Sequence, residues 1–485
     1  MIPLTTDELA TAVNGHCSCG GKGTIEEITI DSRRVTPGAC FFAITGSRTD
    51  GHRYLAEALA AGARTLVLHQ RPGKDLRRAA ADACLIRVED TTKALQATAA
   101  YVRDQVGPRV LAITGSMGKT TTKDLAAELL RERWKTHATL GNLNNQWGLP
   151  LSLLGLQPGH RIMVAELAMS RTGEIGELAR LAAPEIGLIT NIGPVHMAFF
   201  DNLEAVASAK AELAEALPPT GTLIVNADDL RTMAIAERFA GSVQRVLLFG
   251  RGRRSTVRAE DVQQQAGGWQ LKLVLPEQSP VRLQLHLPGE HSLANFLAAA
   301  AAAHSLGLPA KAIAGKAPDL TLPSNRGQVR RLASGVTLID DSYNASPMAM
   351  MRALDTLAGM PAVGRRVMVA GDMLELGSWS ERSHRQIGAH AAQLGIDLIV
   401  AVGQYAEVVA GGAEAAGLAK EAISYFGTAE EAGATLAHRL EAGDLVLVKG
   451  SRALRMERVV ETLAAADAGN GSVPSEPGRR SAVEG

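Results

Sequence analysis

The sequence has little that would draw the chain to a nucleic acid or into a membrane. Its 485 residues carry 50 Lys and Arg against 50 Asp and Glu, so no excess of positive charge is available to attract a polyanion. The longest apolar stretch, residues 293–303, is too short to span a bilayer and is expected to form a buried helix. No basic region followed by an apolar run stands at the start, so no signal peptide is predicted. These absences favour a cytoplasmic protein, with a monomer as the default state.

Cysteine is also scarce. The four cysteines, Cys17, Cys19, Cys40 and Cys84, all lie near the start of the sequence. Cys17 and Cys19 form a C-x-C with no second pair at the spacing of a zinc site. We therefore expect four free thiols in a reducing compartment, and no structural zinc.

What the sequence does contain is a regular alternation of apolar runs and helix-like stretches. A chain of this length is expected to hold about three domains, and the alternation predicts an α/β protein with mostly parallel sheets. We expect a small N-terminal α/β domain over residues 1–106, a central domain with a P-loop ATPase-type sheet over residues 107–322, and a Rossmann-like C-terminal domain over residues 323–468. Residues 255–288 are expected to add antiparallel strands at the edge of the central sheet. The polar residues 469–485 are expected to be a disordered tail.

A Gly-rich turn, Thr114–Thr120, stands between an apolar run and a long amphipathic stretch. Strand, loop and helix in this order place backbone N–H groups and a helix N-terminus where they can hold phosphate oxygens. Lys119 adds a positive charge, and Thr120 offers a hydroxyl to Mg²⁺. The G-x-x-G-K-T spacing is shorter than that of the usual P-loop, but the Lys-Thr pair and its context predict a nucleotide site.

Three further polar residues are candidates for the same site. Glu166 follows one predicted strand and His196 lies just past another, and ligands of open α/β sheets bind beyond the carboxyl ends of strands. Oxygen ligands suit Mg²⁺, so Glu166 is the easier metal ligand. Lys210 falls on the apolar stripe of its predicted helix, where a lysine must extend to solvent, pair with an acid or be modified.

In this order these motifs resemble those of the Mur ligase family. The family phosphate loop is matched at Thr114 to Thr121, and the Asn-rich stretch that follows it is matched by residues 141–154 (GNLNNQWGLPLSLL). TNIGPVHMAFF carries the family His at His196, and SAKAEL carries the family Lys, which is carbamylated, at Lys210. PGEHSLANF resembles the adenine-contacting segment, and SNRGQ places Arg326 as the interdomain arginine. The resemblance extends over residues 1–465 and implies three domains and an ATP-dependent, amide-forming reaction.

The resemblance implies roles for individual residues. Catalytic roles fall to Lys119, Asn145, His196 and Lys210. ATP would contact Gly115, Ser116, Met117, Gly118, Lys119, Thr120, Thr121, Asn295, Arg326, Asp341 and Tyr343, of which the last two face either ribose or adenine. Two Mg²⁺ ions would be held by Thr120, Glu166, His196 and carbamylated Lys210.

One segment narrows the choice within the family. DDSYNASP, residues 340–347, resembles the signature of the branch that adds D-alanyl-D-alanine, and the N-terminal block resembles its UDP-sugar-binding domain. That branch joins D-Ala-D-Ala to UDP-N-acetylmuramoyl-tripeptide through an acyl phosphate in peptidoglycan synthesis, which supports cell shape and division. Ser32 and Arg33 would then contact the uridine nucleotide, and Asn344 the dipeptide.

The chain departs from the family pattern at Met117, Ala168, Ser346 and the Ser324-Asn325 pair, none of which removes a charged group that the chemistry needs. Three other functions are compatible with parts of this pattern: a ligase that adds glutamate to folate, a P-loop kinase or NTPase switch, and an inactive scaffold. The DDSYN segment argues against the first, and the intact charged residues argue against the last. Whether the tripeptide carries diaminopimelate or lysine stays open.

Overall fold

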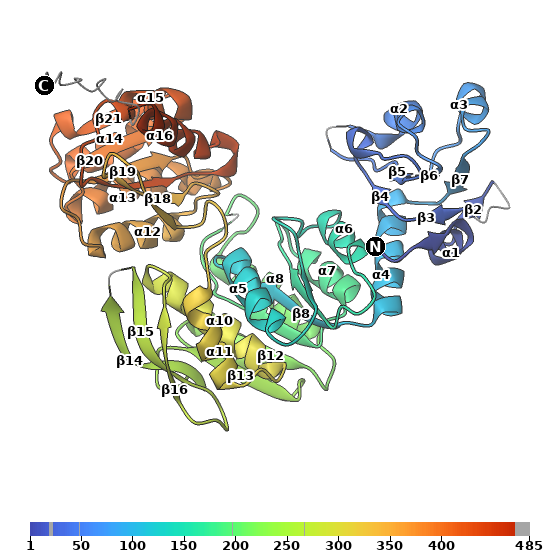
Figure 1. The fold of residues 1–485 in the computed structure, drawn as a ribbon, viewed down its shortest axis with the longest axis horizontal. Helices are drawn as coiled ribbons and strands as arrows, with labels where there is room; N and C mark the ends of the chain where they lie inside the picture. The colour runs from blue at the N-terminus through green and yellow to red at the C-terminus, as the bar shows by residue number, and fades with distance from the viewer. Residues whose placement is uncertain (19–22, 48, 196, 266, 471–485) are drawn as a thin grey trace, which may run out of the picture.

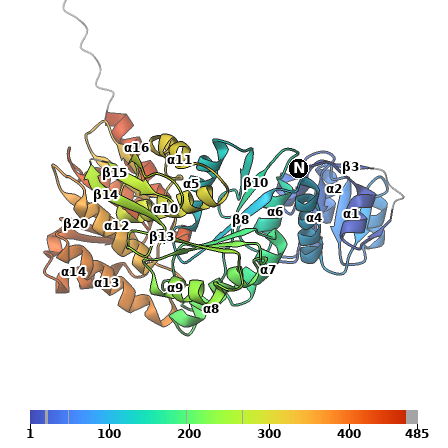
Figure 2. The same ribbon diagram turned by 90° about the horizontal axis from the view of Figure 1, so that it is seen from below.

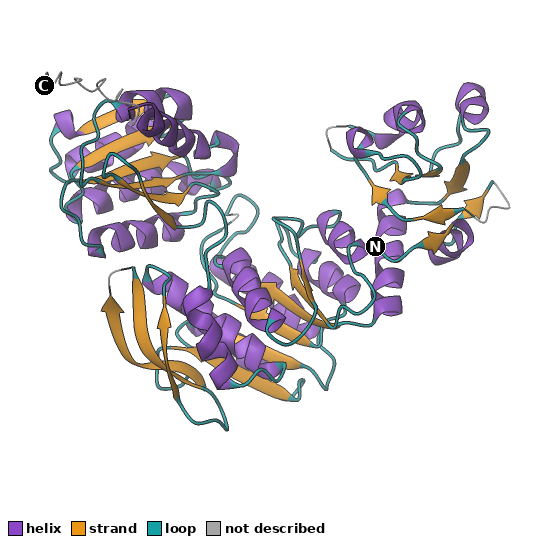
Figure 3. Cartoon of the chain, in the orientation of Figure 1, coloured by secondary structure: helices purple, strands orange, loops and turns teal. Residues whose placement is uncertain are grey.

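The computed structural model describes residues 1–18, 23–47, 49–195, 197–265 and 267–470. It forms three α/β domains in a row, with the N-terminal and C-terminal domains at opposite ends and the central domain between them (Figures 1 and 2). Figure 3 shows helices packed against the sheet in each domain. The predicted fold class is therefore confirmed. Among the described helices, none is long and apolar enough to cross a membrane.

The N-terminal domain is built on a five-stranded sheet in the order β2-β7-β6-β5-β4, in which only β2 is antiparallel to its neighbour. Its strands are β2 (His16–Cys17), β4 (Ile28–Thr29), β5 (Cys40–Phe42), β6 (Thr65–Leu68) and β7 (Cys84–Arg87). A small pair is formed by β1 (Leu4–Thr5) and β3 (Thr24–Ile25). The helices are α1 (Thr6–Ala12), α2 (Leu55–Ala60), α3 (Lys74–Ala79) and α4 (Thr91–Val106). Gly107, with φ 62°, ends α4 and begins the passage to the central domain.

The expectation of four free thiols is wrong at Cys84, which is disulfide-bonded. Its Sγ also lies 3.0 Å from Sγ of Cys17, because β2 runs antiparallel along β7 and brings residues distant in sequence together. The spacing of cysteines in the sequence cannot show such a meeting. Cys40 is free and buried, and burial raises the pKa of its thiol. Cys19 lies outside the described residues.

The central domain has a nine-stranded sheet in the order β16-β15-β14-β13-β12-β11-β8-β10-β9. From β9 to β14 all pairs are parallel, and the pairs of β14 with β15 and of β15 with β16 are antiparallel, as expected for residues 255–288. The strands are β8 (Arg109–Thr114), β9 (Thr136–Ala138), β10 (Ile162–Glu166), β11 (Ile186–Ile189), β12 (Thr222–Asn226), β13 (Arg245–Gly250), β14 (Val257–Gln265), β15 (Gly268–Val274) and β16 (Val281–Leu285).

Helices cover both faces of this sheet and complete two apolar cores. They are α5 (Lys119–Arg131), α6 (Gly148–Leu154), α7 (Glu174–Ala182), α8 (Leu203–Glu215), α9 (Leu230–Phe239), α10 (Glu290–Ser305) and α11 (Ala310–Lys316). Helix α10 packs against α5, and its alanines from Ala298 to Ala303 have no exposed surface. Residues 293–303 are thus the buried helix that their length predicted.

The C-terminal domain has a six-stranded sheet in the order β17-β18-β22-β19-β20-β21, parallel except for β17. Its strands are β17 (Gln328–Arg331), β18 (Thr337–Asp341), β19 (Arg366–Gly371), β20 (Leu398–Val402), β21 (Ile423–Phe426) and β22 (Leu445–Lys449). Its helices are α12 (Pro347–Gly359), α13 (Ser380–Gln393), α14 (Ala406–Ala415), α15 (Ala429–Ala437) and α16 (Glu457–Asn470). Helix α16 includes the first two residues of the expected tail, and residues 471–485 lie outside the described residues.

Candidate active site

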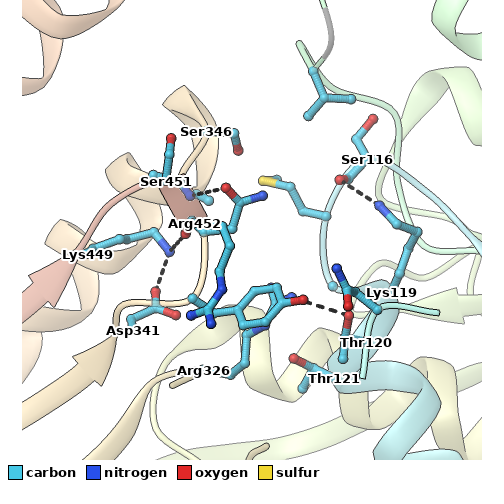
Figure 4. A pocket seen from close by; sticks show the side chains of 18 of the residues that line it. Ser116, Lys119, Thr120, Thr121, Arg326, Asp341, Ser346, Lys449, Ser451 and Arg452 are labelled. Carbon is cyan, nitrogen blue, oxygen red and sulfur yellow. Dashed lines mark hydrogen bonds and ion pairs between the residues drawn. The ribbon is translucent and has the colours of Figure 1, made fainter. Parts of the chain in front are cut away.

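A cavity of about 750 Å³ lies between the central and C-terminal domains. The central domain lines it with the phosphate loop, Glu166 and the start of α10, and the C-terminal domain lines it with Arg326, the segment 341–346 and the end of β22. Side chains from both domains point into this space in Figure 4. The sequence regions predicted to bind ATP, more than two hundred residues apart, therefore meet in one place.

The phosphate loop has the predicted strand, loop and helix context, between β8 and α5. Gly115 and Gly118 have φ angles of 145° and 78°, which side-chain-bearing residues rarely adopt. A Cβ atom would lie 1.9 Å from Oγ1 of Thr190 at the first position and 2.3 Å from Oδ1 of Asn295 at the second. Both glycines are thus required by backbone conformation and by the close approach of neighbours.

Asn191, just after β11, fixes the middle of this loop. Its Oδ1 accepts a hydrogen bond from the Met117 N–H at 3.0 Å, and its Nδ2 donates to the Met117 carbonyl at 3.1 Å. The Oγ of Ser116 donates to the Gly193 carbonyl and accepts from the Gly193 N–H. Met117 is therefore held through its backbone, so its departure from the family pattern leaves the loop conformation intact.

Lys119 begins α5, and its Nζ donates to the carbonyl oxygens of Gly115 and Ser116 at 2.7 and 3.2 Å. Burial lowers the pKa of this ammonium group, and the carboxylate of Glu166 opposes the shift. The positive charge thus sits at the loop itself, beside the N–H groups that open α5. This arrangement suits the binding of an anion such as a phosphate.

Glu166 ends β10, directly beside the loop that leaves the parallel neighbour β8. It is only 2% exposed, and its Oε1 accepts hydrogen bonds from Oγ1 of Thr120 at 3.2 Å and Nδ2 of Asn144 at 2.7 Å. Its Oε2 is buried and has no hydrogen-bond partner among the described residues. A buried carboxylate oxygen of this kind, beside a threonine hydroxyl, fits the hard oxygen ligands that Mg²⁺ prefers.

Lys210 lies on α8 and is 2% exposed, as its place on the apolar stripe predicted. Burial, together with the positive charge of Lys119, lowers the pKa of its amine well below the usual value. The neutral form is therefore more accessible than in a solvent-exposed lysine. His196, the remaining predicted metal ligand, lies outside the described residues.

The Asn-rich segment places two asparagines differently. Asn144 contacts Glu166, whereas Oδ1 of Asn145 accepts hydrogen bonds from the N–H groups of Trp147 and Gly148 at the start of α6. Both side chains line the cavity. The sequence singled out Asn145 for a catalytic role, while the contact with the buried carboxylate belongs to its neighbour.

The C-terminal domain closes the cavity with a cluster of charged and aromatic side chains. Arg326 and Arg452 lie 4.0 and 5.6 Å from the ring centre of Tyr343, and Nζ of Lys449 contacts Oδ2 of Asp341 at 2.6 Å (Figure 4). Lys449 also donates to the Asn344 carbonyl at 3.0 Å. Roles for Arg326, Asp341, Tyr343 and Asn344 follow from the sequence, whereas no role was predicted for Lys449 or Arg452.

Asn295 lies on α10, where its Oδ1 accepts from Oγ1 of Thr122 at 3.4 Å, and it lines the cavity with Thr121. His291 on the same helix also lines it, and burial lowers the pKa of its imidazole. No role was predicted for His291, although it precedes Asn295 by one helical turn. Ser32 and Arg33 lie in the N-terminal domain, away from the cavity lining, with Arg33 paired to Asp31 at 2.8 Å.

Comparison with known proteins agrees with this geometry. Sequence models of the Mur ligase family match residues 24–103 (Mur ligase family, catalytic domain), 113–303 (Mur ligase middle domain) and 325–452 (Mur ligase, glutamate ligase domain). A UDP-N-acetylmuramoyl-tripeptide–D-alanyl-D-alanine ligase of Escherichia coli is 36% identical, over 96% of this chain and 99% of its own. The enzyme of the same name from Bacillus subtilis is 31% identical over the same shares.

Solved structures show the same similarity. The crystal structure of MurF from Acinetobacter baumannii superimposes with a TM-score of 0.86 at 32% identity, covering 96% of this chain and 99% of the other. MurF ligase from Thermotoga maritima in complex with ADP gives a TM-score of 0.78 at 28% identity, covering 92% and 98%.

Proposed function

Because the chain belongs to the Mur ligase family, we propose that it joins D-Ala-D-Ala to UDP-N-acetylmuramoyl-tripeptide at the expense of ATP. Relatives at 36% and 31% identity over nearly their full length carry the name of this activity. The observation that carries the proposal is the meeting of the phosphate loop with Arg326 in one cavity, where Nη2 of Arg326 donates to Oγ1 of Thr120. The product, UDP-N-acetylmuramoyl-pentapeptide, serves peptidoglycan synthesis, and we place the reaction in the cytoplasm of a cell that makes this polymer.

The reaction needs an activated carboxylate, because a free carboxylate is a poor acyl donor at neutral pH. The substrate carboxylate takes the γ-phosphoryl group of ATP to give an acyl phosphate, and ADP leaves. The neutral amine of D-Ala-D-Ala then attacks the acyl carbon, and inorganic phosphate leaves as the amide forms. The task of the protein is to position these groups and offset their charge.

The residues of the phosphate loop divide this task. Backbone N–H groups at the start of α5 would bind the phosphates, and Lys119 and Arg326 would offset negative charge from two sides. Thr120 and the buried Oε2 of Glu166 would hold Mg²⁺, which supplies further positive charge to the transferring phosphoryl group. Asn144 orients the Glu166 carboxylate for that purpose.

Lys210 has the properties that a carbamylated lysine needs. Carbamylation begins with a neutral amine that attacks CO₂, and the lowered pKa of Lys210 favours that form. As a carbamate, Lys210 would present an anion and, with His196 and Glu166, would complete a second Mg²⁺ site. In this proposal the second site serves the substrate carboxylate, and His196 and Asn145 keep the catalytic roles expected from sequence.

The remaining contacts are assigned by position. Asn295 would contact adenine from α10, and Asp341 and Tyr343 would contact ribose or adenine across the cavity. Asn344 and its loop would hold the dipeptide. Ser32 and Arg33 would bind the uridine nucleotide in the N-terminal domain, with the tripeptide reaching toward the cavity. We propose that the protein works as a monomer, since all these groups come from one chain.

Phosphate release from ATP tests this assignment. Release should require both UDP-N-acetylmuramoyl-tripeptide and D-Ala-D-Ala, and mass analysis should find the pentapeptide. L-Ala-L-Ala is the matched control and should support little release. Release that does not depend on the dipeptide, or the absence of a pentapeptide, would point to another amine or to a kinase-like reaction.

A further inference from the structure

Helix α5 carries a buried lysine that the mechanism does not use. Lys123 lies one turn after Lys119, and only 1% of its surface is exposed. A buried ammonium group is strongly destabilising unless it is well hydrogen-bonded or paired with an acid. The burial of this ammonium group, in the helix that follows the phosphate loop, must therefore be offset by specific contacts.

The partners of Lys123 show what it holds. Its Nζ donates to the Thr139 carbonyl at 2.7 Å and to the Gly141 carbonyl at 3.4 Å, and it lies 3.1 Å from Oδ1 of Asp124. Thr139 and Gly141 belong to the segment that leaves β9. Lys123 therefore joins helix α5 to residues 139–141 through their backbone.

The same segment holds Glu166 from two sides. Oγ1 of Thr139 accepts a hydrogen bond from the Glu166 N–H at 3.0 Å, and Nδ2 of Asn144 donates to Oε1 of Glu166 at 2.7 Å. A further bond at 2.9 Å, from the Ala168 N–H to the Asn144 carbonyl, fixes the segment beyond the strand. Residues 139–144 thus set both the backbone and the side-chain direction of Glu166.

These contacts form a closed ring. It runs from Lys123 to Thr139, from the segment 139–144 to Glu166, and from Oε1 of Glu166 back to α5 through Thr120. The two carbonyl oxygens that Lys123 contacts need donors, and an apolar side chain of equal length would leave them unsatisfied. The long side chain of Lys123 reaches both of them from a buried position on α5.

We propose that Lys123 is a positioning residue that holds the segment 139–144 so that Glu166 presents Oε2 to a divalent cation. This inference rests on the proposed function, because that function places Mg²⁺ at Glu166. It concerns metal affinity, however, and not the identity of the amine that is joined. Its failure can therefore be separated from failure of the proposed reaction.

The test is the affinity of the protein–ADP complex for Mn²⁺, a probe for Mg²⁺, measured by electron paramagnetic resonance with excess ADP alone as reference. Loss of a residue that orients a metal ligand typically weakens metal binding by about 10–100-fold, so Lys123→Met should weaken Mn²⁺ binding by about tenfold or more. Lys123→Gln, which keeps N–H donors without charge, should weaken it less. Leu129→Ala, in the buried face of the same helix, is the matched structural control and should lower the melting temperature without changing Mn²⁺ affinity.

An unchanged Mn²⁺ affinity in Lys123→Met, together with a lowered melting temperature like that of Leu129→Ala, would overturn the proposal. If Lys123→Met does not fold, the same readout applies to Lys123→Gln, and unchanged affinity there overturns it equally. Absence of Mn²⁺ binding to the unmodified protein–ADP complex would also overturn it. If the substrate proves not to be UDP-N-acetylmuramoyl-tripeptide, the proposed reaction fails, but the Mn²⁺ result is unaffected.

Discussion

Arg326 of the C-terminal domain donates a hydrogen bond from Nη2 to Oγ1 of Thr120 in the central domain, at 3.3 Å. The contact joins residues on two domains, and its acceptor is the hydroxyl that follows the phosphate-loop lysine. Cζ of the Arg326 guanidinium also lies over the ring of Tyr343, 4.0 Å from the ring centre. The C-terminal domain, which carries the proposed dipeptide site, thereby holds the positive charge of Arg326 beside the phosphate loop.

Arg326→Ala should therefore lower kcat with a smaller effect on the KM of the UDP substrate. A preorganised charge that acts on the transferring group contributes roughly 10²–10³-fold to kcat, and a loss of that order is expected. Arg330→Ala is the matched control, because Arg330 is a half-exposed arginine of the same domain that contacts Asp340 at 3.6 Å. Phosphate release under saturating substrates measures both variants, and an equal loss in the two would contradict the assigned role.

Asn191→Asp tests the clamp on the phosphate loop, which is the pair of hydrogen bonds between the Asn191 side chain and the backbone of Met117. The aspartate could still accept from the Met117 N–H, but it would turn an acceptor toward the Met117 carbonyl, where Nδ2 now donates. The Met117 carbonyl would keep the hydrogen bond from Oγ1 of Thr190 at 2.6 Å, but the second carboxylate oxygen of the aspartate would face it without a donor. Leaving that buried oxygen unsatisfied costs about 1–3 kcal/mol, which corresponds to roughly a 5- to 150-fold rise in the KM for ATP.

Asn202→Asp provides the control for that experiment. Asn202 caps α8 by accepting from the Ala205 N–H through Oδ1, a task that aspartate performs equally well. Its KM for ATP should stay within about twofold of that of the unmodified protein. A similar rise in both variants would mean that added negative charge, and not the broken clamp, is responsible.

Gly118→Ala should abolish ATP binding. A Cβ at this position would lie 2.3 Å from Oδ1 of Asn295, and the φ of 78° adds backbone strain. Gly107→Ala separates the two effects, because Gly107 also has positive φ, 62°, but its nearest neighbour would be 4.0 Å from the new Cβ. That control should lose only about 1 kcal/mol of stability and keep ADP binding, measured by calorimetry. Normal ADP binding by Gly118→Ala would show that the loop can move away from Asn295.

The sequence predicted the fold and much of this site because both follow from local patterns. The phosphate loop, Glu166 at a strand end and Lys210 on a buried stripe are readable from residue type and spacing alone. Lys123, Lys449 and Asn191 are different, since their roles depend on partners that the fold brings from elsewhere. The Lys449 to Asp341 contact joins neighbouring strands β22 and β18, and the Asn191 clamp joins β11 to the loop after β8. The disulfide at Cys84 was missed as well, because the spacing of cysteines along the chain does not show which of them meet.

His384 should make the stability of the C-terminal domain depend on pH. Its ring is 1% exposed, Nε2 accepts a hydrogen bond from the Met373 N–H at 2.8 Å, and Nδ1 donates to the Ser380 carbonyl at 2.7 Å. The side chain stacks on Tyr405 with ring centres 4.4 Å apart. Both nitrogens are used by the neutral ring, so a second proton would break the bond from Met373.

Burial lowers the pKa of His384 below its usual 6.5, although the Ser380 carbonyl and Asp372 oppose the shift. Between the folded and unfolded pKa the unfolded chain binds more protons, so stability rises with pH. The contribution of His384 to stability is complete above pH 6.5 and is lost as pH falls through the folded pKa.

The variant His384→Gln keeps an acceptor for the Met373 N–H but does not titrate. The difference in melting temperature between the unmodified protein and this variant should therefore shrink below pH 6.5, by roughly 2–4 °C for each kcal/mol lost. Comparing the two proteins cancels the titration of other histidines, such as the half-buried His137 and His304, whose pKa values are also lowered by desolvation. A difference that stays constant from pH 8 to pH 5 would show that His384 contributes through packing alone.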